Sequence, residues 1–183
     1  RLLPDSFVLY KPKDIVSGDF YWFDQSNGKV FFAAVDCTGH GVPGAFMSIV
    51  GHNLLKQIMS KYQNIPPAKI LDELNKGVRD TLHQRNFEES TSKDGMDITL
   101  CSIDKKSNEL EFAAAFNPLY LVREGEIFEI KANKFSVGIY LEKESRNFTN
   151  HKLKLKKGDV VYIFSDGYAD QFGGPKGKKF KYK

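Results

Sequence analysis

The feature that most constrains the fold is an acid placed where an apolar run gives way to a helical pattern. The run Val30–Val35 is rich in β-branched and aromatic residues, which predicts a strand, and it ends on Asp36. Pro43 then opens a helical pattern, as proline often does in a first helical turn. A plain connection needs one glycine, whereas this one has Gly39 and Gly41 behind a carboxylate. We therefore expect the loop to hold a bound group.

The spacing of apolar residues along the sequence predicts helices and strands for most of the chain. This spacing predicts helices over Pro43–Lys61 and from Pro67 to about His83. A polar loop is expected at Arg85–Gly95. Asn27-Gly28 is a strong two-residue turn signal, which pairs its flanking strands as an antiparallel hairpin. Strands, two helices and further strands predict an α+β fold with large antiparallel sheets. The expected strands are Phe7–Pro12, Ile15–Asp24, Lys29–Asp36, Met96–Asp104, Glu109–Phe116, Leu119–Arg123, Glu126–Ile130, Lys152–Leu155 and Val160–Phe164.

Length and composition predict one globular domain. The chain has 183 residues, of which 41% are hydrophobic and 27% charged, and this suits a single core. No internal repeat or low-complexity linker divides residues 1–183. The last segment, Phe172–Lys183, is rich in glycine and lysine without a closing strand or helix, which indicates either a frayed basic tail or a shortened domain.

Charge, hydropathy and cysteine usage narrow the class of function. A net charge of +4 is too small to imply a nucleic-acid partner. The sequence has no stretch approaching the ~20 apolar residues of a membrane span, and no secretory signal leads it. Cys37 and Cys101 have neither CxxC nor zinc-site spacing. We therefore expect a cytoplasmic location, either free or as the cytosolic part of a membrane-bound sensor.

Three aspartates lie in matching contexts next to apolar strands. Asp36 and Asp166 each end an apolar run, and Asp19 lies in the pattern before the hairpin. Each could cap a turn, which is the common role of aspartate before glycine. If they converge, each close pair repels by about 4 kcal/mol at an effective dielectric of about 20. A divalent cation such as Mg²⁺ or Mn²⁺ would remove that repulsion. Position alone favours metal, although periodicity does not show that the acids meet.

Three segments, in order, resemble the motifs of a known family. They are residues 16–21 (VSGDFY), 36–43 (DCTGHGVP) and 164–167 (FSDG). They are similar to the G-G-D-F-Y-D, D-x-S-G-H-G-x-P-A-A and T-D-G or S-D-G motifs of the PPM family. This family comprises metal-dependent serine/threonine protein phosphatases, and the similarity is to its SpoIIE-like branch of sporulation and sigma-factor regulators. The resemblance covers essentially the whole chain and implies an αββα sandwich, two antiparallel sheets between helical layers.

The resemblance also implies roles for individual residues. Asp36 resembles the acid that bridges two metal ions, and the backbone carbonyl of Cys37 would complete the second ion's site. Asp166 resembles a carboxylate ligand of the other ion, and Asp19 resembles the acid that holds the cluster directly or through bound water. The implied cofactor is a pair of Mn²⁺ or Mg²⁺ ions, which activate water for in-line attack on phosphorus.

The sequence also departs from the family pattern. Ser17 replaces the first glycine of G-G-D, Thr38 replaces a serine, and Trp22 stands where an acid is common. The family has a further D-D or D-N motif after a helix and a final strand, and nothing after Asp170 matches it. We therefore expect residues 1–183 to lack the C-terminal part of the domain, which leaves the site incomplete. Asp97 superficially resembles the missing motif, but it precedes the third motif where the family has an ordinary core strand, so we assign it to structure.

Other polar residues near the motifs receive supporting roles. Gly39, His40 and Gly41 either shape the loop or position the reacting groups, because metal-bound water needs no general base. Lys11 and Lys13 could bind a substrate phosphate, and a solvated strand edge is the alternative.

The predicted function is metal-dependent hydrolysis of phosphoserine or phosphothreonine on a bacterial signalling protein. By resemblance, the substrate is of the anti-sigma-factor-antagonist type and an upstream sensor domain regulates the enzyme; homodimerisation is left open. One alternative is a non-catalytic signalling module that retains the fold, which the missing motif favours. The other is a nucleotide cyclase, because residues 17–20 (SGDF) faintly resemble a G-G-D-E-F hairpin.

Overall fold

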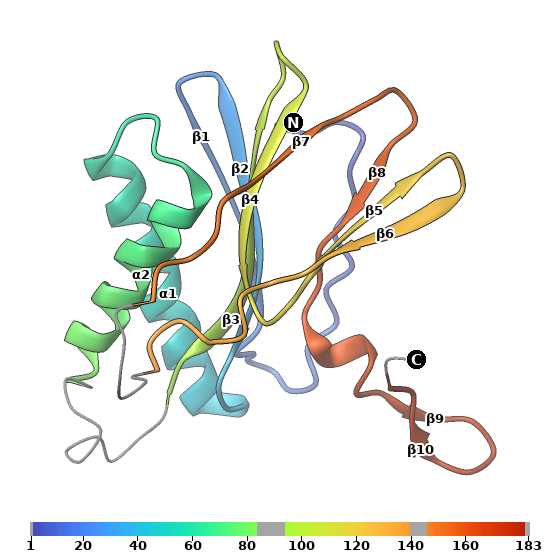
Figure 1. The fold of residues 1–183 in the computed structure, drawn as a ribbon. Helices are drawn as coiled ribbons and strands as arrows, with labels where there is room; N and C mark the ends of the chain where they lie inside the picture. Colours follow the sequence, from blue (N-terminus) through green and yellow to red (C-terminus); the bar gives the residue numbers. More distant parts are fainter. Residues whose placement is uncertain (1, 84–93, 140–145, 182–183) are drawn as a thin grey trace.

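The structure is a computed structural model that describes residues 2–83, 94–139 and 146–181. Two antiparallel sheets pack face to face, and two helices cover the outer face of the larger sheet (Figure 1). The larger sheet has the strand order β1-β2-β3-β4-β7, and the smaller sheet has the order β6-β5-β8. The elements are β1 (Phe20–Ser26), β2 (Lys29–Cys37), α1 (Gly41–Lys61), α2 (Pro67–Thr81), β3 (Met96–Asp104), β4 (Glu109–Ala115), β5 (Leu119–Arg123), β6 (Glu126–Ile130), β7 (His151–Lys154), β8 (Val160–Tyr162), a 3₁₀ turn (Asp166–Tyr168), β9 (Phe172–Gly173) and β10 (Lys178–Lys179).

The α+β fold expected from the sequence is confirmed, as is the hairpin around Asn27-Gly28. These two residues have φ values of 50° and 80°, the left-handed conformation that a two-residue hairpin turn requires. Strands β3, β5 and β6 have the expected limits, and the limits of β2, β4, β7 and β8 differ by one or two residues. Most of the polar loop expected at 85–95 lies outside the described residues.

Three expectations about regular structure were wrong. Residues Phe7–Pro12 form no strand, and Phe7 remains 76% exposed, because an alternating pattern does not by itself provide a partner strand. Strand β1 begins at Phe20 rather than Ile15, because Gly18 packs against the loop that follows β2 instead of extending the hairpin. The C-terminal segment, expected to lack a closing strand, contains the short antiparallel hairpin β9–β10.

Side chains alternate along the larger sheet and so separate two cores. On β2, Phe31 and Val35 belong to the core shared with α1 and α2, whereas Phe32 packs in the core between the two sheets. Asp36 continues the face of Phe32, because residues two and four apart on a strand share one face. The carboxylate at the end of β2 is therefore turned toward the smaller sheet.

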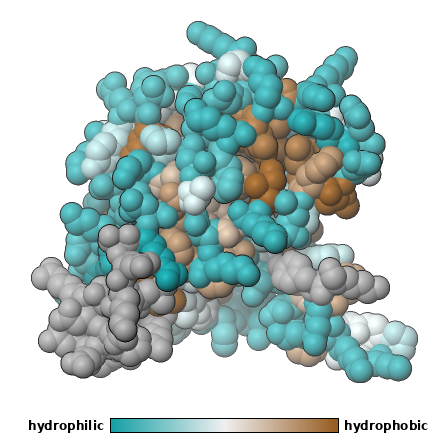
Figure 2. Space-filling view, in the orientation of Figure 1, coloured by the Kyte–Doolittle hydropathy of each residue, from teal (hydrophilic) through white to brown (hydrophobic). Residues whose placement is uncertain are grey.

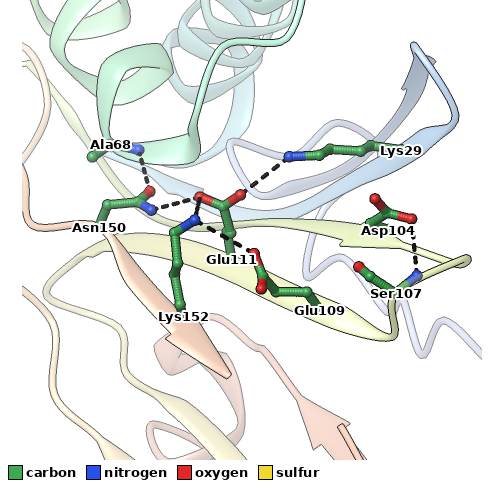
Figure 3. A network of polar contacts seen from close by, with 8 residues as sticks. All are labelled: Lys29, Ala68, Asp104, Ser107, Glu109, Glu111, Asn150 and Lys152. Atoms are coloured by element: carbon green, nitrogen blue, oxygen red, sulfur yellow. Dashed lines mark hydrogen bonds and ion pairs between the residues drawn. The ribbon is translucent and has the colours of Figure 1, made fainter. Parts of the chain in front are cut away.

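A polar network fixes the helical layer to the larger sheet (Figure 3). Glu111 on β4 is buried, and its carboxylate accepts hydrogen bonds from Lys29 on β2 at 3.1 Å and from Asn150 at 2.8 Å. Asn150 Oδ1 accepts the backbone N–H of Ala68, in the first turn of α2, at 3.2 Å. Lys152 Nζ on β7 lies 3.7 Å from the Glu111 carboxylate. The start of α2 is thereby attached to strands β2, β4 and β7.

Within the described residues, both helices lie in one layer on the outer face of the larger sheet. The outer face of the smaller sheet is open, with Ile127 69% exposed and Val160 and Tyr162 also exposed. Figure 2 shows apolar atoms gathered at the upper right, in the region of this sheet. No helix in the part of the chain that the structure describes is long and apolar enough to cross a membrane.

Candidate metal centre

Asp36 lies half-buried at the end of β2, between the two sheets. Burial is the largest cause that raises its pKa, from 3.8 to about 8, and the charges of Asp19 and Asp166 raise it further. The backbone N–H of Asp166 donates to Asp36 Oδ2 at 3.4 Å and acts in the opposite direction. A carboxyl group in such surroundings keeps its proton near neutral pH unless a cation compensates the negative charge.

Asp19 reaches this end of the sheet because it directly precedes β1. The β1–β2 register extends to Phe20, so Asp19, one residue further, lies beside Asp36. Its backbone is fixed on both sides: the N–H of Asp19 donates to Ser17 Oγ at 3.1 Å, and its carbonyl accepts the Tyr10 hydroxyl at 3.0 Å. Ser17, which departs from the glycine of the family motif, thus supplies a hydrogen-bond acceptor that glycine lacks.

Asp166 comes from the other sheet. It begins the 3₁₀ turn Asp166–Tyr168 that follows β8, and its carbonyl accepts the N–H of Asp170 at 2.9 Å. In Figure 1 this turn and the β2–α1 loop lie at the same, lower end of the two sheets. The structure therefore brings Asp19, Asp36 and Asp166 together from three distant segments.

The loop after β2 is packed closely against the segment before β1. A Cβ on Gly18 would lie 2.8 Å from the Gly39 oxygen and 3.2 Å from the Cys37 oxygen, and a Cβ on Gly44 would lie 2.6 Å from the Gly39 oxygen. Contacts below 3.0 Å are not tolerated by real side chains, so positions 18 and 44 require glycine. Sequence analysis did not identify Gly44, which stands directly after Pro43 where the family motif has alanine.

Gly39 and His40 lie in the turn between β2 and α1, and Gly41 is the first residue of α1. The two glycines have φ values of 88° and 62°, a region that other residues rarely adopt. The His40 side chain is 83% exposed, and its Nδ1 lies 3.8 Å from Asp14 Oδ2. His40 is thus at the solvent-facing rim of the loop.

Cys37, Lys11 and Lys13 contribute in different ways. The Cys37 thiol is buried, and burial, with the charges of Asp36 and Asp19, raises its pKa to about 12. The thiol is therefore neutral at physiological pH, which leaves the backbone carbonyl as the donor that this residue can offer. Lys11 and Lys13 lie exposed in the N-terminal segment.

Asp97 lies closer to these acids than sequence analysis suggested. It was assigned to an ordinary core strand, and it does lie on β3, but the β2–β3 register places it directly opposite Asp36. Ser136 Oγ donates to Asp97 Oδ1 at 2.6 Å. The pKa of Asp97 is raised, chiefly by burial; the Ser136 hydrogen bond opposes this shift and the charge of Asp166 adds to it. The sequence contained no signal for this proximity, because the order of strands in a sheet is not local information.

The converging groups fit a hard divalent cation in chemistry. No three His, Cys, Asp or Glu side chains in residues 2–83, 94–139 and 146–181 are arranged to hold an ion as they stand. The donors are nevertheless carboxylates with a backbone carbonyl near them, which is the ligand type of Mg²⁺ and Mn²⁺. The repulsion that raises the pKa of Asp36 is also what a cation would relieve. Asp19, Asp36 and Asp166 are the candidate ligands.

Comparisons with known proteins find related domains. The sequence profile of the family described as Stage II sporulation protein E (SpoIIE) matches residues 26–182. The comparison with curated proteins gives no match.

Solved structures share the fold. The SiaA-PP2C domain of Pseudomonas aeruginosa is 31% identical, with a TM-score of 0.83, over 96% of this chain and 66% of that chain. The PP2C phosphatase domain of SpoIIE from Bacillus subtilis, solved with a fragment of its regulatory domain, is 24% identical, with a TM-score of 0.66, over 85% of this chain and 42% of that chain. RsbX in complex with magnesium is 15% identical, with a TM-score of 0.62, over 87% and 71%. This chain thus spans just under two thirds of the SiaA-PP2C chain and less than half of the SpoIIE chain.

Proposed function

Because the chain belongs to the SpoIIE family of PPM-type phosphatase domains, we propose that it hydrolyses phosphoserine or phosphothreonine on a bacterial signalling protein in a metal-dependent reaction. The observation that supports this proposal is the convergence of Asp19, Asp36 and Asp166, where burial, together with the charges of Asp19 and Asp166, raises the pKa of Asp36 to about 8. Carboxylates arranged against their own repulsion are suited to holding cations.

The proposed roles follow from where each group lies. Asp36 would hold cations together with Asp166, which comes from the turn after the smaller sheet's β8, and with Asp19, which comes from the segment before β1. The carbonyl of Cys37 is the further oxygen donor. Two divalent ions, when bound, supply Lewis-acid activation of water and neutralise charge on the phosphoryl oxygens. The buried thiol of Cys37 takes no part, because its raised pKa keeps it protonated.

The proposal extends to the kind of metal ion and the class of substrate. Mn²⁺ and Mg²⁺ both suit an all-oxygen donor set, and the similar fold of RsbX was solved with magnesium. We propose a phosphorylated substrate of the anti-sigma-factor-antagonist type and an upstream sensor domain as the regulator. Lys11 and Lys13, both exposed, would contact the phosphate or the acidic surface of that substrate.

The domain organisation is part of the proposal. Residues 1–183 belong to a single phosphatase-type domain with the αββα arrangement. The exposed apolar face around Ile127, Val160 and Tyr162 fits this arrangement, because a second helical layer would cover it.

The decisive experiment is hydrolysis of p-nitrophenyl phosphate and a phosphoserine peptide with Mn²⁺, and again with excess EDTA. The protein should release phosphate only with the metal, and Asp36→Asn should abolish this release. Asp104→Asn is the matched control and should retain activity, because Asp104 lies at the end of β3 that is remote from Asp36. Full Mn²⁺-dependent turnover by Asp36→Asn would refute the metal assignment. Mn²⁺ binding without turnover would favour the alternative of a non-catalytic signalling module.

A further inference from the structure

We propose that Asp97 and Ser136 are positioning residues of the carboxylate centre, an inference that rests on the function proposed above. Asp97 on β3 is the cross-strand partner of Asp36 on β2, so the two side chains leave the sheet on the same face. That face is the one turned toward the smaller sheet, from which Asp166 comes. Asp97 is therefore a fourth carboxylate at the place where the other three converge.

Two acids directly opposite each other are unfavourable in a sheet that has only to fold. Like charges at paired positions destabilise neighbouring strands, and here the pair is also half-buried. The same pair is favourable once positive charge lies beside it, because each carboxylate then attracts the cation or accepts hydrogen bonds from its bound water. The arrangement thus indicates that Asp97 serves the carboxylate centre and does not stabilise the sheet.

Ser136 fixes the orientation of the Asp97 carboxylate. Met96 and Val137 exchange two backbone hydrogen bonds, both 2.9 Å, and this bridge holds Ser136 next to Asp97. The Ser136 hydroxyl donates to Asp97 Oδ1 at 2.6 Å. A hydroxyl has one proton to donate, whereas a carboxylate has about four acceptor positions, so most of its acceptor capacity remains for other donors or a cation.

The segment that carries Ser136 is in turn attached to α2. The N–H of Gly138 donates to Asn75 Oδ1 at 2.9 Å. Asn75 lies on α2, on the opposite side of the larger sheet from the acids. The position of Ser136, and with it the orientation of Asp97, is therefore set by contacts to a helix and by the β3 bridge together.

The test is Mn²⁺ binding by isothermal titration calorimetry, a measurement that does not depend on turnover. Asp97→Asn should weaken the Kd by about 10-fold or more, and Ser136→Ala should weaken it to a smaller extent, as outer ligands of metal sites do. Ser136→Thr keeps the hydroxyl and should bind Mn²⁺ with the affinity of the wild type. Asp104→Asn, on the same strand but away from the acids, should bind as the wild type does.

Thermal unfolding in EDTA separates this role from a structural one. Removing a charge from the Asp36–Asp97 pair should leave the Tm of the metal-free Asp97→Asn variant unchanged or higher, while its Mn²⁺ affinity falls. An Asp97→Asn variant that binds Mn²⁺ within about twofold of the wild type overturns this inference, given the 10-fold or larger loss typical of such partners. If Asp36→Asn also binds normally, or the wild type does not bind Mn²⁺ at all, the proposed function fails together with it.

Discussion

The backbone N–H of Asp166 donates to Asp36 Oδ2 at 3.4 Å, across a sequence separation of 130 residues. This contact joins the end of β2 in the larger sheet to the 3₁₀ turn after β8 in the smaller one. This hydrogen bond acts to lower the pKa of Asp36. Burial and the charges of Asp19 and Asp166 act in the opposite direction and outweigh it. The net effect is a raised pKa of Asp36, and this shift has measurable consequences.

The stability of the metal-free protein should fall as the pH rises. The pKa of Asp36 is raised from 3.8 to about 8, so between these values the folded state holds a proton that the unfolded state has lost. The Tm measured in EDTA should therefore decrease from pH 5 to pH 8, and Asp36→Asn should flatten this dependence. Saturating Mn²⁺ should raise the Tm more at pH 8 than at pH 5. A metal-free Tm that increases over this range would contradict the electrostatic account of the site.

Gly44→Ala should damage the metal loop although it lies in a helix. Alanine normally stabilises a helix interior relative to glycine, but here its Cβ would lie 2.6 Å from the Gly39 oxygen. We expect a loss of about 1–3 kcal/mol in the free energy of unfolding from this overpacking, with weaker Mn²⁺ binding because the loop behind Asp36 must shift. Gly173→Ala, where a Cβ meets open space, is the control in urea unfolding and Mn²⁺ titration. Equal behaviour of the two variants would show that the close approach is unimportant.

Glu111→Ala should destabilise the fold without a direct effect on the metal site. Burial would raise the pKa of Glu111, but hydrogen bonds from Asn150 and Lys29 and the charges of Lys29 and Lys152 outweigh it, so the pKa is lowered. Removing this charged acceptor should cost about 2 kcal/mol in urea unfolding at pH 7. Because a lowered pKa stabilises above the unfolded value of 4.5, the difference from wild type should shrink as the pH falls below that value.

The neighbouring acid Glu109, on the same strand, provides the matched comparison for this network. It forms an exposed ion pair with Lys152 at 3.4 Å, and such pairs contribute little. Glu109→Ala should therefore change the free energy of unfolding by less than about 1 kcal/mol. If the two variants were equally unstable, the attachment of α2 through Glu111 would not be a main source of stability.

Cys37→Ala should retain metal-dependent activity. The thiol is buried with a pKa raised to about 12, and only the carbonyl of this residue is proposed to contact a cation. Both Cys37 and Cys101 are buried, so the native protein should react slowly with Ellman's reagent and the denatured protein rapidly. A large loss of Mn²⁺-dependent turnover in Cys37→Ala, with the fold intact by circular dichroism, would assign a role to the side chain.

Much of the fold was predictable because it depends on local signals. The Asn27-Gly28 turn, the limits of β3, β5 and β6 and the presence of two helices were all indicated by period and turn chemistry. Residues Phe7–Pro12 misled the same reasoning, since their alternation is that of a strand although no partner strand lies beside them in the described structure. Membership of the SpoIIE family also removes the nucleotide cyclase alternative, which one short motif had suggested.

The sequence by itself determined which acids end apolar strands, where the glycine-rich loop lies, and which family these motifs belong to. These are properties of short segments, in which residue type and spacing decide the local conformation. Only the tertiary structure decided that Asp19, Asp36 and Asp166 meet, that Asp97 lies opposite Asp36 with Ser136 as its hydrogen-bond donor, and that Gly44 must be small. Strand register and the packing of two sheets set these relationships, and both depend on contacts between residues far apart in the chain, which no local pattern encodes.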